Sequence, residues 1–320
     1  MASLFANAAE SAAGLHRTSQ GSLVVPVSSP SLMDGLPDTY TVHRFSTMKR
    51  LQAEAQRTRQ NLLETEDGNQ WIVVLGLSPS VIQKLDDDHT SLGDVTYRFQ
   101  WEGTAGLIKV VPSHSHDTTT DRFTRYIDSR LSAMGIDTFY IMWAATSTYK
   151  PTPAKGKQGD QTFIPPSRWP SAQQTADWGW PTFVLETGVS ESLPRLREDA
   201  RWWFADSRGD VRIVLLISIK KSCVKFEKWQ LAPPNAARPL TRAYINSMLS
   251  QSPSMPPLIQ QPAATQQAYC AQEVEVTPTD IHGAPIILPF AALFDRDPGP
   301  SETDVVINAQ QLRAIVHVLF

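Results

Sequence analysis

The chain has 320 residues, of which 41% are hydrophobic and 19% charged, so it can bury a sizeable core and is not disordered throughout. Its net charge of −3 and pI of about 6.2 give no overall attraction to nucleic acid or to an anionic membrane. Two cysteines, Cys223 and Cys270, are too few for a disulfide framework, which favours a reducing compartment.

The chain offers no candidate for a membrane anchor. Its longest apolar run, residues 213–219, is far short of the ~20 residues that span a bilayer. The N-terminus lacks the charged-then-apolar pattern of a signal peptide. We therefore expect an intracellular protein, nuclear or cytoplasmic, without membrane contact.

The N-terminal part combines a loose segment with the first regular elements. Residues 1–38 are rich in Ala, Ser, Gly and Pro, and we expect them to be disordered. The pattern over 41–64 favours an amphipathic helix, and 71–77 is typical of a strand. Residues 97–101 and 107–111 have the pattern of the two arms of a hairpin.

The middle of the chain contains the clearest helix. Residues 118–134 carry apolar side chains at spacings of four, four and three, namely Phe123, Ile127, Leu131 and Met134. Asp117 or Thr118 can cap this helix, and Gly135 ends it. The apolar run 138–143 then predicts a buried strand.

The next part alternates loops, strands and a helix. Residues 146–180 are rich in Pro and Gly and are expected to be a loop, with a short strand at 160–164. A strand at 180–188, a helix at 193–204 and two strands follow, the latter at 211–219 and 224–231. The sequence therefore predicts an α/β protein with a mixed central sheet flanked by helices.

We expect one main domain between looser segments. After the disordered segment 1–38, it covers residues 39–231 and is followed by a Pro-, Ser- and Gln-rich linker or insert at 232–268. Residues 269–320 form a C-terminal extension that packs on this domain, with a helix from Asn308.

Carboxylates at the ends of these elements are the main candidates for chemistry. Asp117 opens a helix, Asp160 begins a short strand, and Glu186 lies near the end of an apolar strand. Oxygen ligands of this kind suit Mg²⁺. The alternative is structural, with Asp117 as a helix cap and Asp160 as a loop residue, but Glu186 in such a strand needs a partner. Similarly, His114 and His116 are either ligands or an exposed loop pair.

The order of these acids resembles the PD-(D/E)xK restriction-endonuclease-like superfamily. Residues 181–192, followed by the helix and by 211–215, look like a group of uncharacterised fungal proteins that resemble this superfamily. Three shorter stretches extend the similarity to about residues 70–320: Val110–Ser113 with His116 and Asp117, Gly159–Phe163, and Ile287–Phe290 with Leu293, Phe294 and Arg296.

The resemblance implies a restriction-endonuclease-like core and a Mg²⁺-dependent cleavage of DNA or RNA. Asp160 and Glu186 would be the two motif acids, and Asp117 the acid of the preceding helix, all three as metal ligands. The motif lysine is missing, because Gly188 stands two residues after Glu186. The nearest lysines are Lys220 and its neighbour, so Lys220 is the candidate for the catalytic lysine.

Two functions therefore stay open: a metal-dependent nuclease, and a nuclease-derived module that binds protein or nucleic acid without catalysis. Nine basic and five acidic residues between Arg195 and Lys228 form either a phosphate-binding patch or a solvated face. Trp202 and Trp203 either stack on bases or lie in the core. The missing lysine favours the module, whereas the two acids favour the nuclease.

Overall fold

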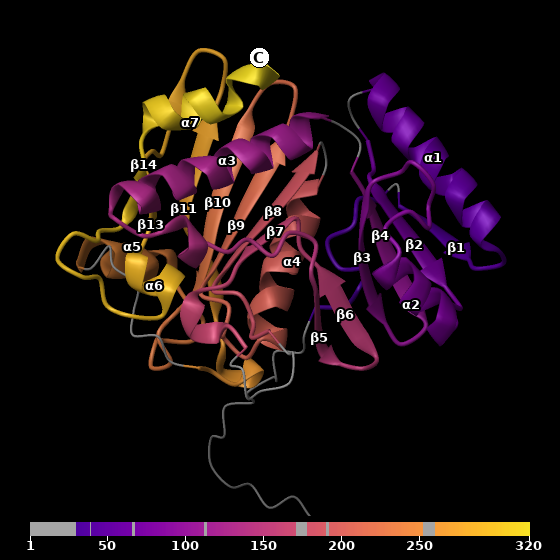
Figure 1. Cartoon of the computed structure of the whole chain (residues 1–320), viewed down its shortest axis with the longest axis horizontal. Helices are drawn as coiled ribbons and strands as arrows, with labels where there is room; N and C mark the ends of the chain where they lie inside the picture. The colour runs from indigo at the N-terminus through magenta and orange to yellow at the C-terminus, as the bar shows by residue number, and fades with distance from the viewer. Residues whose placement is uncertain are drawn as a thin grey trace, which may run out of the picture.

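The fold is that of a computed structural model, which describes residues 30–38, 40–65, 68–111, 114–170, 178–189, 192–251 and 260–320. Two mixed sheets flanked by helices confirm the predicted α/β class (Figure 1). None of the described helices is long and apolar enough to cross a membrane. Most of the segment 1–38, which was expected to be disordered, lies outside the described residues.

The first sheet comes largely from the N-terminal half and has the order β1-β2-β4-β3-β6-β5. Its strands are β1 Thr41–Arg44, β2 Trp71–Leu75, β3 Tyr97–Glu102, β4 Ala105–Val110, β5 Thr148–Thr152 and β6 Lys155–Gln158. One face packs on helices α1 (Met48–Thr65) and α2 (Pro79–Asp87), seen at the right of Figure 1. The predicted hairpin β3–β4 is confirmed.

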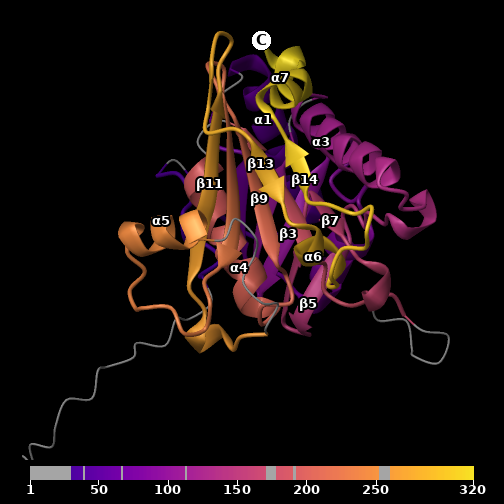
Figure 2. The ribbon, with the colours of Figure 1, turned by 90° about the vertical axis from the view of Figure 1, so that its left-hand side faces the viewer.

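The second sheet has the order β12-β11-β10-β9-β8-β7. Its strands are β7 Gln161–Phe163, β8 Phe183–Val189, β9 Ile213–Ile219, β10 Val224–Leu231, β11 Ala268–Val276 and β12 Ile281–His282. Strands β8 and β9 are parallel, as expected for two strands joined by a helix, here α4 (Leu193–Asp206). Helix α3 (His114–Ala133) covers the opposite face (Figures 1 and 2).

The C-terminal elements complete the core on the α3 side. A two-stranded sheet of β13 (Ile286–Leu288) and β14 (Val305–Ile307) packs there with α6 (Phe290–Phe294) and α7 (Ala309–Val316). Figure 2 shows α7 next to α3. The backbone of Ile287 in β13 binds Lys228 of β10 and Gln272 of β11. Asn308 caps α7 through a capping box, as the sequence predicts.

Alternation along the strands decides which side chains meet between the two sheets. In β8, Phe183 and Leu185 face α3, whereas Val184 packs with the α4 core. In the first sheet, Arg98 pairs with Lys109 and Gln100 with Lys157 across neighbouring strands, so each pair shares one face. This polar face points away from α1 and α2 and toward α4.

A short N-terminal segment closes the space beside α4. Residues 31–36, which we call the strap, pack Leu32 against Trp71 and Leu107 of the first sheet. The guanidinium of Arg195 donates to the carbonyl oxygens of Leu32 (2.9 Å) and Asp34 (3.0 Å). The strap therefore ties the first sheet to the beginning of α4.

Three predictions for local structure were wrong. The run 138–143 is no strand: Thr138–Tyr140 is a 3-10 turn capped by Asp137, and Phe139 is 86% exposed. The expected loop 146–180 contains β5 and β6 as well as β7, although 171–177 lie outside the described residues. Helix α3 begins at His114, so Asp117 lies in its first turn, where a negative charge suits the helix dipole.

The expected insert 232–268 begins and ends at neighbouring strands. It contains helix α5 (Arg242–Gln251), which packs on Ala232, Tyr269 and Ala271, while 252–259 lie outside the described residues. Leu231 of β10 pairs with Ala268 of β11. The part after 268 thus contributes β11 and β12 to the same sheet as β8–β10.

The strap gives a first prediction. Gly35 has a φ of +71°, and an added Cβ would lie 2.6 Å from the backbone oxygen of Pro194. We expect Gly35→Ala to destabilise the protein by more than the ~1–2 kcal/mol that a left-handed backbone costs by itself. Urea unfolding measures this loss. The matched control is Gly135→Ala (φ +88°, open space), which pays the backbone cost alone; equal losses in the two variants would contradict the assigned contact.

Candidate functional site

The two motif acids lie side by side and share a lysine. Asp160 directly precedes β7, and the pairing of Gln161 with Leu185 sets it beside Glu186 of β8. The ammonium of Lys109, from β4 of the other sheet, lies 2.5 Å from Asp160 Oδ2 and 3.4 Å from Glu186 Oε2. All three side chains are buried, with at most 3% exposed.

Further donors surround both carboxylates. Glu186 Oε1 accepts from the Trp203 indole at 2.8 Å and lies 3.4 Å from the Lys157 ammonium. Asp160 Oδ2 accepts from the backbone N–H of Thr187 at 2.7 Å, and Oδ1 lies 3.1 Å from the Arg98 guanidinium. Three of the four carboxylate oxygens therefore accept hydrogen bonds, whereas Asp160 Oδ1 has the ionic contact with Arg98 but no hydrogen bond among the described residues.

The charged cluster continues along α4. Asp199 Oδ1 accepts from Lys157 and from Arg195, each at 2.8 Å, and Arg195 also donates to Gln100. Two helical turns further on, Asp206 pairs with Lys155 at 2.8 Å. Acids of the second sheet and α4 thus meet lysines and arginine of the first sheet across a buried interface, which we call the interface cluster.

These contacts shift the pKa values of the two acids in opposite directions. Burial raises the pKa of Glu186, and the charges of Lys157 and Lys109 offset this only in part. For Asp160, burial acts in the same direction, but Lys109, His116 and Arg98 outweigh it and hold its pKa well below the usual range. Asp160 is therefore the fixed anion of the pair.

His116 connects α3 to this cluster as a cation. Its Nε2 lies 3.0 Å from the Thr187 carbonyl oxygen and 3.3 Å from Asp160 Oδ2, and its Nδ1 lies 3.1 Å from Asp117 Oδ1. Both ring nitrogens face acceptors, an arrangement that favours the doubly protonated ring. Burial lowers the pKa of His116, but the charge of Asp160 and the hydrogen bond to Asp117 raise it above its ordinary value.

The residues present do not fit a divalent metal ion. Among the described residues, no group of three or more His, Cys, Asp or Glu side chains is arranged to hold one. A cation shared by Asp160 Oδ2 and Glu186 Oε2 would have to occupy the place of the Lys109 ammonium, which already donates to both oxygens. The remaining oxygen of Asp160, Oδ1, lies 3.1 Å from the guanidinium of Arg98.

The sequence-predicted residues are brought together only in part. Asp160 and Glu186 converge, whereas the Asp117 side chain is 60% exposed and contacts them only through His116. Lys220 is exposed in the turn between β9 and β10, and no contact found in the described part of the chain joins it to either acid. The lysines near the acids are Lys109 and Lys157.

The sequence reasoning missed these lysines because alternation in a strand normally marks the polar side chains as solvent-facing. Lys109 stands between Ile108 and Val110, the pattern of a half-exposed strand. The one available signal was Glu186, an acid in an apolar strand that required a buried partner.

Three arginines in the basic stretch around α4 are paired with acids. Arg197 pairs with Glu227, Arg201 with Glu198, and Arg212 with Asp295. Trp202 and Trp203 are fully buried in the α4 core, so they are not available to stack on bases.

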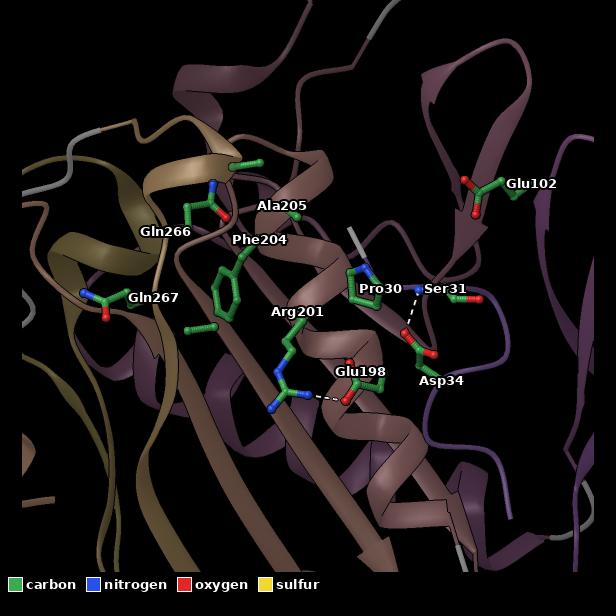
Figure 3. A pocket seen from close by; sticks show the side chains of 12 residues that line it. Pro30, Ser31, Asp34, Glu102, Glu198, Arg201, Phe204, Ala205, Gln266 and Gln267 are labelled. Carbon is green, nitrogen blue, oxygen red and sulfur yellow. Dashed lines mark hydrogen bonds and ion pairs between the residues drawn. The ribbon is translucent and has the colours of Figure 1, made fainter. Parts of the chain in front are cut away.

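A cavity of about 650 Å³ lies on the outer side of α4, away from the acid pair (Figure 3). Of its charged groups, Glu198 pairs with Arg201 and Asp34 accepts the Ser31 N–H at 2.8 Å, whereas Glu102 stands alone without a partner among the described residues. This cavity therefore presents no unpaired cluster for chemistry.

Comparison with known proteins gives little further information. No family model and no curated protein matches the chain. Among solved structures, a DUF820 protein of Anabaena variabilis ATCC 29413, assigned provisionally to the nucleases, is similar over 48% of this chain and 84% of its own, with 13% identity and a TM-score of 0.30. A match at this TM-score does not indicate a shared function. The chemistry of the site is therefore derived from the residues of this chain alone.

The opposite pKa shifts predict unequal effects of removing the two charges. Asp160→Asn removes the carboxylate that Lys109 and Arg98 face. We expect the free energy of unfolding to fall by about 3–5 kcal/mol, which is typical of a broken buried ion pair. Glu186→Gln should cost clearly less, below ~2 kcal/mol, because burial already disfavours the Glu186 charge. Urea unfolding at neutral pH measures both losses; the reverse order would contradict this description of the pair.

His116 predicts a pH dependence of stability. Because its folded-state pKa is raised, its contribution is complete below the unfolded value of about 6.5 and disappears as the pH rises through the folded value. We compare wild type with His116→Gln, which does not titrate, by urea unfolding from pH 5.5 upward. The stability difference in favour of wild type should shrink as the pH increases; a constant difference would rule out the imidazolium.

Proposed function

We propose that this chain is a nuclease-like fold that works as a protein-binding module, without metal-dependent catalysis at its acid pair. The observation that carries the proposal is the Lys109 ammonium, which lies between Asp160 and Glu186 in a buried site. A lysine in this position supplies a positive charge where a metal ion shared by the two carboxylates would otherwise bind.

Burial supports the same conclusion. A phosphodiester has to reach the activating group, but the side chains of Asp160 and Glu186 are at most 1% exposed beneath the first sheet. The order of helix α3, strand β7 after Asp160, strand β8 with Glu186, helix α4 and parallel strand β9 is the one that the sequence resemblance implies. The fold can therefore be retained when the catalytic chemistry of the site is lost.

A metal-dependent nuclease is the second candidate, and one observation favours it. Asp160, Glu186 and two lysines do converge, so the lysine missing at position 188 is replaced in space by Lys109 or Lys157. In that case Asp160 and Glu186 would hold Mg²⁺, which would activate a water for hydrolysis of DNA or RNA.

Melting temperatures with and without millimolar Mg²⁺ or Mn²⁺ decide between these functions. We expect no shift for wild type and no cleavage of single- or double-stranded DNA or RNA. Lys109→Met removes the ammonium but keeps the bulk of the side chain, so Mn²⁺ should raise the Tm of this variant. At a hundredfold excess of Mn²⁺ over Kd, the free energy of unfolding should increase by about 2.7 kcal/mol.

The control is Lys220→Met, which alters an exposed lysine and should behave like wild type. A Mn²⁺-induced Tm shift in wild type that disappears in Glu186→Gln, together with cleavage, would overturn the proposal in favour of the nuclease.

A further inference from the structure

We propose that a groove between the edges of the two sheets binds a proline-rich, extended segment of a partner protein, with a basic residue beside its prolines. The inference rests on the protein-binding role proposed above and names the class of partner. It concerns a different part of the molecule from the interface cluster, so the two can be tested separately.

The groove is large and lined by aromatic rings. It has a volume of about 1160 Å³ and runs between edge strand β5 and residues 142–144 and 178–180. Tyr149 and Trp180 stack with their centroids 5.5 Å apart, and Trp143 and Trp178 also line it. Trp178 is 49% exposed.

The aromatic surface continues beyond one end of the groove. Ile164 lines the groove, and its carbonyl oxygen accepts the indole N–H of Trp169 at 3.0 Å. Trp169 stacks on Tyr140, which is 54% exposed, and Phe139 beside it is 86% exposed. Exposed aromatic side chains at and near a groove favour an interaction surface, and Trp and Tyr are the residues that dominate binding energies.

Size and charge select a peptide as the occupant. The volume exceeds the roughly 300–1,000 Å³ of small-molecule sites. Lys150 is the lysine that lines the groove, and Asp86 binds it at 2.7 Å, while Asp87 lies exposed at the rim. A nucleic acid would need an excess of positive charge, which this groove lacks.

The edge of β5 favours a polyproline II segment over an added β-strand. Pro151 removes an N–H donor from β5, Pro153 follows in the turn to β6, and the pairing of β5 with β6 is irregular between Tyr149 and Thr152. Strand addition depends on such backbone donors. A polyproline II segment makes no backbone ladder and docks its prolines on aromatic side chains, at low entropic cost.

The negative charge of Asp87 at the rim of the groove favours a basic residue beside the prolines of the partner segment. Helix α2 ends at Asp87, so its carboxyl end adds the negative pole of the helix dipole to the Asp87 charge. An arginine or lysine next to the prolines complements this end of the groove.

Fluorescence anisotropy tests the proposal with a labelled decapeptide of prolines ending in one arginine. A Gly/Ser decapeptide with the same arginine is the matched probe. Wild type should bind the proline peptide at least about tenfold more tightly than the Gly/Ser peptide, and Trp178→Ala should weaken proline-peptide binding by about tenfold or more. Asp87→Lys should weaken binding of this peptide but not of an uncharged polyproline peptide.

Leu63→Ala is the control, because Leu63 is similarly exposed (45%) but lies on α1. This variant should bind the proline peptide as tightly as wild type does. Unchanged Tm values confirm that the variants fold. Equal binding of the two peptides, no binding at millimolar peptide, or equal losses in Trp178→Ala and Leu63→Ala would overturn the proposal. So would an oligothymidine that binds in a Trp178-dependent way, or a dimer that Trp178→Ala dissociates. Metal-dependent cleavage by wild type would refute the proposed function without affecting these measurements.

Discussion

The fold depends on the neutralisation of buried charges between its two sheets. Lys109 and Lys157 of the first sheet meet Asp160 and Glu186 beside the second sheet and Asp199 of α4 where water is excluded, so each charge requires the others. An ionised group left alone in such a place would be strongly destabilising. The relative position of the sheets is therefore fixed by directional contacts as well as by apolar packing, which needs no such geometry.

The same contacts would hold a nuclease-like arrangement of acids in place even without nuclease activity. The acids of the second sheet lie where the resemblance expects them, at the start of β7 and within β8. Their counterion is a side chain from the first sheet, so both acids have a structural role that would preserve them in the absence of catalysis. Recognition of the motif in a sequence therefore indicates the architecture more directly than it indicates activity.

The sequence was sufficient where a single periodicity governs an element. The repeat from Phe123 to Leu131 identified α3, and the apolar run in β9 identified a strand buried on both faces. It failed where tertiary contacts decide. The aromatic run 138–143 looks like a core strand, but it forms an exposed turn, and Lys109 looks solvent-facing, but a second sheet covers it. Local patterns do not contain the partner that covers a face, and Glu186 indicated only that some buried partner was needed, without naming it.

The junction of β10 with β11 has a consequence for how this fold varies. The chain leaves the sheet at Leu231 and returns at its partner Ala268, so the ends of the intervening segment are held together whatever lies between them. Closing a longer loop between fixed ends adds only about 0.6 kcal/mol for each doubling of its length. This point can therefore accept or lose whole structural units during evolution while both strands, and the buried charges beside them, stay in register.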